Sequence, residues 1–408
     1  MLLPRTLSGL LETAVQGFPA VLVTGPRQSG KTTLLRTRFE ATHGYVSLEA
    51  PHIRERALAD PVGFLADHPA PVILDEIQNA PALLSYLQGE IDADRRPGRW
   101  LLSGSQSFPL VQGTSQSLAG RVAILTLLPL SWSEISHRAR AQESVEAVLA
   151  EMFAARPGKE APTSAGLARW LLYGGFPQLW SDLKVDRQLW LSSYIQTYLE
   201  RDVRSVLGVR DLGTFQTFLR LAAVRTGQVL NLVDLARDVG VSAPTIRQWL
   251  SVLEASHQIF FLRPYFENHG KRLIKAPKLY WLDTGLVCLL LGLKDEDAVL
   301  RGPMAGALFE TAVVAEIAKL FYHRGQPPAL WYWRSREGHE VDLLVEMSGK
   351  LYPIEIKLTT TPRPAHVDNL VRWRALVGEA AGSGLLVASA ENASSLVPDI
   401  RVLPWHRL

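Results

Sequence analysis

One stretch of eight residues near the start of the chain limits the possible folds more than any other feature. It runs Gly25, Pro26, Arg27, Gln28, Ser29, Gly30, Lys31, Thr32 and matches G-x-x-x-x-G-K-[ST], the pattern of a phosphate-binding loop. The apolar residues 20–23 before it predict a buried strand, and residues 33–36 after it predict the first turns of a helix. This order of strand, loop and helix is the context that the pattern requires.

The residues of this loop suit the binding of a nucleotide. Glycines allow a tight turn that directs several backbone N–H groups at one anion, and the following helix N-terminus adds partial positive charge. We expect Lys31 to reach the outer phosphates of ATP and the Thr32 hydroxyl to ligate Mg²⁺. Thr33, the next residue, completes the predicted nucleotide-binding set. ATP and Mg²⁺ are therefore the expected cofactors.

A second apolar run, residues 71–74, ends in the two acids Asp75 and Glu76. In open α/β sheets, ligands bind at the C-terminal ends of the strands, which is where these carboxylates would lie. Asp75 is expected to hold Mg²⁺, directly or through water, and Glu76 to orient and deprotonate the attacking water. The alternative is an ordinary strand end with solvated acids, which the phosphate-binding loop upstream disfavours.

Two further strands are predicted around residues 99–102 and 122–127. The first ends in Ser103-Gly104-Ser105-Gln106, where Ser105 or Gln106 could sense the γ-phosphate; the alternative is plain turn chemistry. Arg121 precedes the second strand and could act as a transition-state arginine, in its own chain or from a neighbour, or be a solvated side chain. Strands that alternate with helices predict a parallel, doubly wound sheet.

Composition sets the broad class of protein. The chain has 408 residues, of which 47% are hydrophobic and 20% charged, as in globular proteins with several domains. Its only cysteine, Cys288, excludes a disulfide within the chain and fits a reducing cytoplasm. Neither a signal peptide nor a membrane-spanning run is recognisable. The net charge of +3 is too small to decide for or against a nucleic-acid partner.

The motifs together resemble those of one protein family. The segments GPRQSGKTT, VILDEIQ, WLLSGS, SLAGR and PLSWSEI, followed by the YGGFP run at 173–177, resemble AAA-type ATPases of bacteria and archaea with a C-terminal domain of unknown function. The resemblance covers nearly the whole chain. It implies an ATPase, and we expect a homo-oligomer.

Residues 211–290 predict a winged helix. Residues 231–240 form a capped helical pattern closed by glycine, residues 243–250 begin a second helix, and residues 259–262 and 278–282 would pair as a hairpin. The predicted nucleic-acid contacts are Arg247, Lys271, Arg272 and Lys275, because a basic hairpin can contact phosphates without reading sequence. Winged helices also dock proteins, so a protein partner is the alternative.

The last third of the chain carries a second group of charged residues. Residues 340–346 and 351–357 predict a hairpin, and strand geometry places Glu355 and Lys357 on one face, with Asp342 on the neighbouring strand. Glu310, on a predicted helix at 305–321, could complete the cluster. Asp342, Glu355 and Glu310 would bind Mg²⁺, and Lys357 would orient or deprotonate water.

This arrangement is similar to the PD-(D/E)XK nuclease fold, although Val341 stands where the name has proline. The motif E-x-K is short and often arises by chance, and members of such superfamilies can bind without cutting. Cleavage is therefore left open.

The predicted fold is α/β and has four parts. They are a P-loop AAA-type core at 1–135, a helical lid or linker at 136–210, a winged helix at 211–290 and a PD-(D/E)XK-like domain at 291–408. We expect a Mg²⁺-dependent ATPase that acts on DNA in remodelling, branch processing or repair. The alternative is a nucleotide-dependent switch that binds a protein partner and has no nuclease activity.

Overall fold

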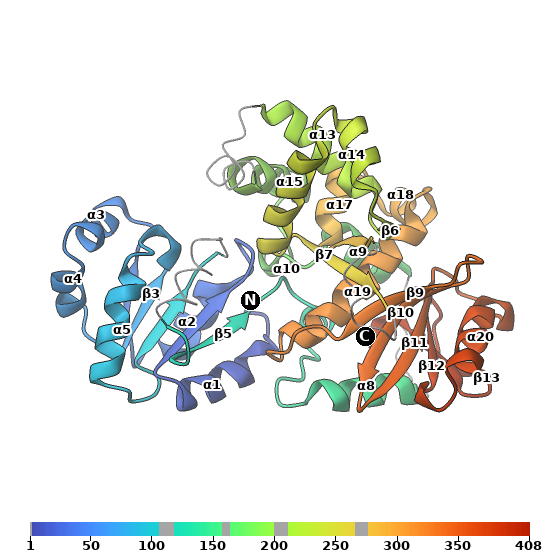
Figure 1. Cartoon of the computed structure of the whole chain (residues 1–408), viewed down its shortest axis with the longest axis horizontal. Coiled ribbons are helices and arrows are strands. Elements are labelled where there is room, and N and C mark those ends of the chain that lie inside the picture. Colours follow the sequence, from blue (N-terminus) through green and yellow to red (C-terminus); the bar gives the residue numbers. More distant parts are fainter. Residues whose placement is uncertain (1, 106–117, 157–163, 200–210, 266–275) are drawn as a thin grey trace.

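The computed structural model describes residues 2–105, 118–156, 164–199, 211–265 and 276–408. Figure 1 shows three regions around a common centre. They are an N-terminal unit (residues 2–130), a largely helical middle unit (164–301) and a C-terminal unit built on a second sheet (305–408), with a connecting segment at 131–156. Lys271, Arg272 and Lys275 lie outside the described residues.

The N-terminal unit alternates strands and helices. Its elements are α1 (Leu7–Gly17), β1 (Ala20–Thr24), α2 (Lys31–Phe39), β2 (Gly44–Ser47), α3 (Pro51–Ala59), α4 (Pro61–Asp67), β3 (Val72–Asp75), the short η1 (Ile77–Asn79), α5 (Leu83–Ala93), β4 (Trp100–Ser103) and β5 (Val122–Thr126). The strands pair in the order β2-β3-β4-β1-β5, and every pair is parallel. The predicted parallel α/β sheet is therefore confirmed.

Both faces of this sheet are covered. Val21 and Val23 of β1 pack with α1 and α2 on one face, whereas Leu22 of the same strand packs with α3, α4 and α5 on the other. Successive side chains of a strand point to opposite faces, so an all-apolar strand requires helices on both sides. The loop after β1 is thereby held at the C-terminal edge of a rigid sheet.

The connecting segment and the middle unit are mostly helical. Their elements are α7 (Trp132–Ile135), α8 (Val145–Ala154), α9 (Ser164–Tyr173), α10 (Pro177–Ser181), α11 (Arg187–Tyr194), the π-helical η2 (Ile195–Leu199), α13 (Leu212–Val224), β6 (Gln228–Val229), α14 (Leu232–Val239), α15 (Ala243–Ala255), β7 (Ile259–Pro264), β8 (Lys278–Trp281), α17 (Thr284–Leu290) and α18 (Glu296–Arg301). Asn231 caps α14, Gly240 ends it with a φ of 82°, and Ser242 caps α15. A helix, a short turn and a second helix thus precede an antiparallel strand pair, β7 and β8.

The C-terminal unit contains the longest helix described. Its elements are α19 (Ala305–Tyr322), β9 (Leu330–Arg334), β10 (Glu340–Met347), β11 (Lys350–Lys357), η3 (Pro364–Val367), α20 (Asp368–Val377), η4 (Gly378–Ala380), β12 (Gly384–Ala388), β13 (Ser394–Val397), β14 (Ile400–Pro404) and η5 (Trp405–Arg407). β10 and β11 form the predicted antiparallel hairpin, with Leu343 opposite Ile354.

The strands of the middle unit continue the sheet of the C-terminal unit. β7 pairs in parallel with β9, which gives one composite sheet in the order β13-β14-β12-β11-β10-β9-β7-β8-β6. One continuous hydrophobic core runs through both units and includes Trp249, Trp281 and Phe309. The two units therefore form a single packed body rather than two independent modules.

The connecting segment packs under the composite sheet. Figure 1 places α8 beside the C-terminal strands, and the rings of Phe153 and Tyr352 lie 4.8 Å apart.

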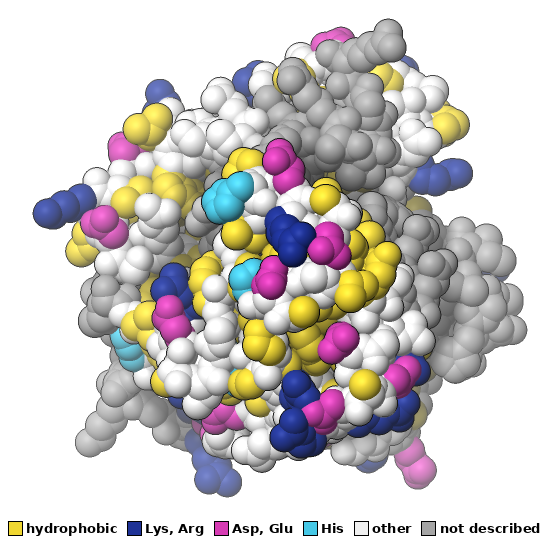
Figure 2. Space-filling model, turned by 90° about the vertical axis from the view of Figure 1, so that its left-hand side faces the viewer, with side chains coloured by type: hydrophobic (Ala, Val, Ile, Leu, Met, Phe, Trp, Pro, Cys, Tyr) yellow, Lys and Arg dark blue, Asp and Glu magenta, His cyan; other side chains and the backbone are white. Residues whose placement is uncertain are grey.

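On the end of the molecule shown in Figure 2, Lys and Arg side chains alternate with Asp and Glu, and the described residues form no large patch of one charge. Among the helices of the described ranges, none has the length and apolar composition needed to cross a membrane.

Candidate functional site

The phosphate-binding loop follows β1 and requires glycine at two positions. Gly25 has a φ of +140°, and a Cβ there would lie only 2.1 Å from the carbonyl oxygen of Leu127. Gly30 has a φ of +94° and stands as the N-cap of α2. Only glycine adopts both conformations without strain, so the loop can bend tightly into the N-terminus of α2. This is the strand–loop–helix arrangement that the sequence predicts.

Lys31 lies folded over this loop. Its ammonium donates hydrogen bonds to the carbonyl oxygens of Pro26 (2.8 Å) and Gly25 (3.2 Å), and its side chain is almost fully buried. A buried ammonium that donates to the carbonyls of a concave loop is well placed to exchange those carbonyls for phosphate oxygens. Nearby, the hydroxyl of Ser29 is buried and has no hydrogen-bond partner among the described residues.

Thr32 and Asp75 meet at the end of the sheet. The Thr32 hydroxyl donates to Asp75 Oδ1 at 2.9 Å, and Tyr45 donates to Oδ2 at 2.9 Å. Ser103 also donates to Oδ1. Burial, reinforced by the Asp75 charge, raises the pKa of Tyr45 to about 12. A hydroxyl and a carboxylate oriented side by side are hard oxygen ligands, so these residues fit Mg²⁺.

Glu76 follows Asp75 in a left-handed backbone conformation, with a φ of 57°. The amide of Gln78 donates to the Glu76 carboxylate and, at 3.0 Å, to the Ser105 hydroxyl. The structure thus links Glu76 and Ser105, both predicted site residues, through Gln78. Sequence reasoning missed Gln78, although it lies only two residues beyond the acid pair.

A cavity of about 730 Å³ opens beside the loop. The N-terminal segment, α2 and the start of α10 line it, through residues that include Leu3, Arg5, Gln28, Thr33, Pro177 and Gln178. The YGGFP run thus reaches the phosphate-binding loop, and the space could receive the sugar and base of a nucleotide.

Arg5 and Glu134 form an ion pair that stabilises the phosphate-binding loop. Arg5 donates to the carbonyl oxygens of Ser29 and Leu128, each at 2.6 Å, and its Nε lies 3.3 Å from Glu134. Glu134 is completely buried and accepts hydrogen bonds from the backbone N–H groups of Thr6 (2.6 Å) and Ser131 (3.0 Å). Sequence reasoning missed this pair, because the two residues are far apart along the chain.

Arg121 lies away from the loop in its own chain. It precedes β5, whose first residue pairs with Ala20 at the start of β1, whereas the loop follows the last residue of β1. Asp92 binds its guanidinium at 2.7 and 2.9 Å. Arg121 therefore lies at the N-terminal ends of the strands, opposite the phosphate-binding loop, and cannot reach phosphates bound in its own chain. An action on a neighbouring protomer stays a prediction.

The C-terminal unit brings Asp342, Glu355 and Lys357 together, as strand geometry predicts. The ammonium of Lys357 lies 2.7 Å from Glu355 and 3.8 Å from Asp342, whose Oδ2 accepts the backbone N–H of Ile356 at 2.9 Å. Burial and the neighbouring Asp342 raise the pKa of Glu355 to about 8.

Glu310 joins this group from α19 but has different partners. Lys278 of β8 lies 3.2 Å from Glu310 and 2.5 Å from Glu340, and the Tyr280 hydroxyl donates to Glu310 at 2.5 Å. Burial and the charge of Asp342 raise the pKa of Glu310, while Lys278 opposes the shift. We call Glu310, Glu340, Asp342 and Glu355, with Lys278 and Lys357, the carboxylate cluster.

A divalent cation does not fit the carboxylate cluster as arranged. Within the described ranges, no three His, Cys, Asp or Glu side chains converge as the ligands of one metal ion. The structure differs here from the predicted Mg²⁺ site of Glu310, Asp342 and Glu355, because an ammonium group contacts one oxygen of each of these acids.

The predicted DNA-contact residues are only partly described. Arg247 is exposed on α15, beside the exposed Gln248. On α14, Arg237 is neutralised by Asp234 at 3.2 Å and Asp238 at 3.6 Å. The described part of the helix–turn–helix segment therefore presents few unneutralised cations.

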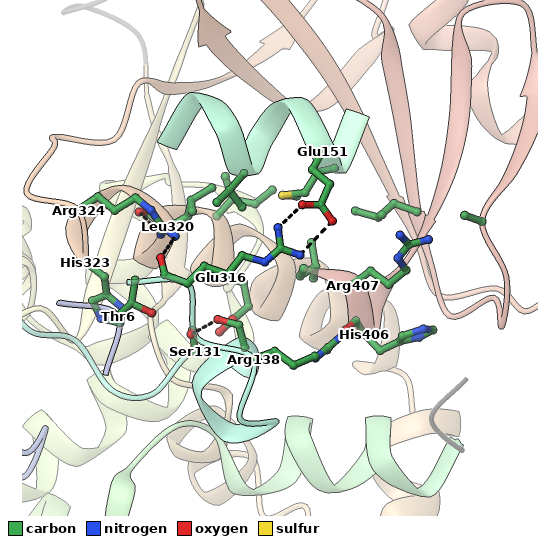
Figure 3. Close-up of a pocket in the computed structure, with 18 of the residues that line it drawn as sticks. Thr6, Ser131, Arg138, Glu151, Glu316, Leu320, His323, Arg324, His406 and Arg407 are labelled. Carbon is green, nitrogen blue, oxygen red and sulfur yellow. Dashed lines mark hydrogen bonds and ion pairs between the residues drawn. The ribbon is translucent and has the colours of Figure 1, made fainter. Parts of the chain in front are cut away.

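Figure 3 shows a second cavity, of about 360 Å³, where the connecting segment meets α19 and the end of the chain. Its charged lining residues include Arg138, Arg140, Glu151, Glu316, Arg324 and Arg407. Glu316 accepts the backbone N–H of Trp132 at 2.6 Å, and Lys319 donates to the carbonyl of Leu130 at 3.0 Å. These contacts fix α19, which also carries Glu310, to the last residues of the N-terminal unit.

Comparisons with known families define the class of protein. A model described as AAA domain matches residues 17–136, and two models described as domains of unknown function match residues 164–297 (DUF8612) and 305–408 (DUF4143). The N-terminal unit is therefore an AAA-type P-loop ATPase domain, followed by a DUF4143 domain, as the resemblance implied.

Relatives extend this result to most of the chain. The uncharacterized protein Rv2008c of Mycobacterium tuberculosis is 35% identical over 360 residues, which cover 88% of this chain and 74% of the relative. The uncharacterized protein Mb2031c of Mycobacterium bovis matches equally well. The chain belongs to the same family as these proteins. A Walker-type ATPase of Pyrococcus abyssi aligns with 18% identity over 70% of this chain and 94% of its own, with a TM-score of 0.43.

Proposed function

We propose that the chain hydrolyses ATP with Mg²⁺ at the phosphate-binding loop. The observation that carries this proposal is the contact between the Thr32 hydroxyl and Asp75, beside the buried ammonium of Lys31. Thr32 and Asp75 would hold Mg²⁺, which neutralises phosphate charge when bound. The loop N–H groups and Lys31 would bind the phosphates.

Glu76 is the residue proposed to orient and deprotonate the attacking water. Its carboxylate stands at the C-terminal end of β3, directly after Asp75, and Gln78 fixes its position against Ser105. A carboxylate that accepts a hydrogen bond from a neutral amide still has lone pairs for a water molecule. Ser105 is the proposed contact to the γ-phosphate side of the site.

Glu76→Gln tests this assignment. It should lower ATP turnover by at least about 100-fold, because the amide cannot accept the proton of the water, and nucleotide affinity should change less than about threefold. Phosphate release and a fluorescent ATP analogue measure the two quantities. Glu90→Gln, an exposed site on α5, is the matched control. Normal turnover by Glu76→Gln would exclude the proposed role.

We further propose that ATP turnover is coupled to DNA binding by the middle unit. The support is a capped helix–turn–helix followed by an antiparallel strand pair, with Arg247 exposed on the second helix. The strands of this pair belong to the composite sheet, and α19 links that sheet to the N-terminal unit. Phosphodiester cleavage is not part of the proposal, because ammonium groups contact Glu310 and Glu355 in the carboxylate cluster.

A panel of single-stranded, duplex and branched DNA tests the coupling through the ATPase rate. At least one form should raise the rate, and Arg247→Ala should weaken DNA binding and reduce the salt dependence of log K by about one unit of slope. Arg301→Ala on α18, an exposed arginine paired with Asp297, is the control. If no DNA form changes the rate, the DNA part of the proposal fails.

A nucleotide-dependent switch that binds a protein is the second candidate function. It is favoured by α14, where acids neutralise Arg237 and the apolar side chain of Val233 is 67% exposed. Exposed apolar residues beside neutralised charges suit a protein surface better than a phosphate backbone. The same DNA panel separates the two, because the switch predicts slow hydrolysis that no DNA accelerates.

A further inference from the structure

We propose that Lys278 is a built-in counter-ion that neutralises the carboxylate cluster in place of a divalent cation and so holds the middle and C-terminal units together. The inference goes beyond the proposed ATPase function, because it concerns other units of the chain and requires no nucleotide.

Lys278 belongs to the middle unit, whereas the acids that it neutralises belong to the C-terminal unit. It begins β8, and its ammonium contacts Glu310 of α19 at 3.2 Å and Glu340 of β10 at 2.5 Å. Its side chain is 4% exposed, and charged groups at that depth are paired. One ammonium therefore joins three elements that are otherwise separate in sequence.

Tyr280 reinforces this arrangement. It lies two residues after Lys278, on the same face of β8, and its hydroxyl donates to the Glu310 oxygen that Lys278 also contacts. The ring of Tyr332 lies 5.6 Å from the Lys278 ammonium. The same oxygen of Glu310 is thus bound by two side chains of β8.

The charges explain why a cation is not needed. The cluster holds four acids, Glu310, Glu340, Asp342 and Glu355, and the ammonium groups of Lys278 and Lys357 supply the two positive charges that one divalent cation would bring. Hard cations require several oxygens directed at one point, at about 2.0–2.6 Å. Lysine contacts direct one oxygen of each acid toward nitrogen instead. One buried oxygen, Glu355 Oε2, has no hydrogen-bond partner among the described residues.

Calcium rescue tests the proposal in nucleotide-free protein. Lys278→Met should melt roughly 5 °C or more below the wild type, because the acids lose their counter-ion. Millimolar calcium chloride should restore most of this loss in Lys278→Met and shift the wild type by less than about 1 °C. The double variant Lys278→Met/Glu310→Gln should show no rescue. Lys184→Met, at an exposed position, is the control.

Two results would overturn the proposal. One is a Lys278→Met protein with wild-type stability or without calcium rescue. The other is a rise in the melting temperature of the wild type with calcium that disappears in Glu310→Gln, because a cation would then bind beside Lys278.

If Lys278→Met does not fold, a terbium titration of the wild type and Glu310→Gln decides instead. Equal emission in the two proteins supports the lysine counter-ion. Emission that Glu310→Gln removes excludes it.

Discussion

Lys31→Ala should lower ATP turnover by at least about 100-fold while the protein stays folded. Lys31 is the lysine of the G-K-[ST] motif, and in the structure its ammonium donates hydrogen bonds to the Pro26 and Gly25 carbonyls. Its loss therefore removes charge from the transition state but leaves the packing of β1 and α2 intact. Phosphate release measures the turnover, and circular dichroism together with the melting temperature reports the fold.

Lys31→Arg distinguishes charge from geometry. A guanidinium keeps the positive charge, but it is planar and larger, and the buried position of Lys31 leaves little room for it. We expect turnover nearly as low as in Lys31→Ala. Lys184→Ala, an exposed lysine, should behave like the wild type. Substantial turnover by Lys31→Ala would mean that the loop is not the hydrolytic site.

Local sequence patterns were sufficient for the elements that carry the nucleotide site. The apolar run before Gly25 became β1, and the run that ends at Asp75 became β3, because a strand covered on both faces is apolar along most of its length. The hairpin that brings Asp342 and Glu355 to the same lysine also followed from local rules, since the two-residue period of strands fixes which side chains share a face.

Contacts between distant segments could not be predicted in this way. Lys278 begins the second strand of the predicted hairpin, yet it is buried against Glu310 because β7 pairs with β9 and β8 thereby joins the composite sheet. Whether Arg121 lies near the phosphates depends in the same way on which end of β5 lies beside the phosphate-binding loop. No periodicity encodes such pairings, because they are set by which strands lie next to one another.

Glu134→Gln should destabilise the protein by about 3 kcal/mol, since it leaves a buried arginine without its counter-ion. Glu134 is completely buried, and its carboxylate contacts Arg5 at 3.3 Å and accepts the N–H groups of Thr6 and Ser131. Arg5 also holds the Ser29 carbonyl of the phosphate-binding loop at 2.6 Å. The substitution should therefore weaken nucleotide binding as well. Urea denaturation at constant protein concentration measures the loss of stability.

The dependence on pH separates the charge of Glu134 from its shape. Burial would raise the pKa of this carboxyl, but the charge of Arg5 and the backbone N–H groups hold it below its ordinary value. A carboxyl whose pKa is lower in the folded than in the unfolded state stabilises the fold at pH values above its unfolded-state pKa of 4.5. This stabilisation disappears as the pH falls through the folded-state pKa. The difference in stability between wild type and Glu134→Gln should therefore be full at pH 7 and should narrow only as the pH falls below 4.5.

Glu151→Gln is the matched control for this pH series. Glu151 pairs with Arg140 at the surface of the connecting segment, and its side chain is 50% exposed. Solvent screens such a pair, so the substitution should cost less than about 1 kcal/mol at every pH. If the two variants lose the same stability at pH 7, or if the difference for Glu134 does not narrow in acid, the ionised Glu134 carboxylate does not brace the loop.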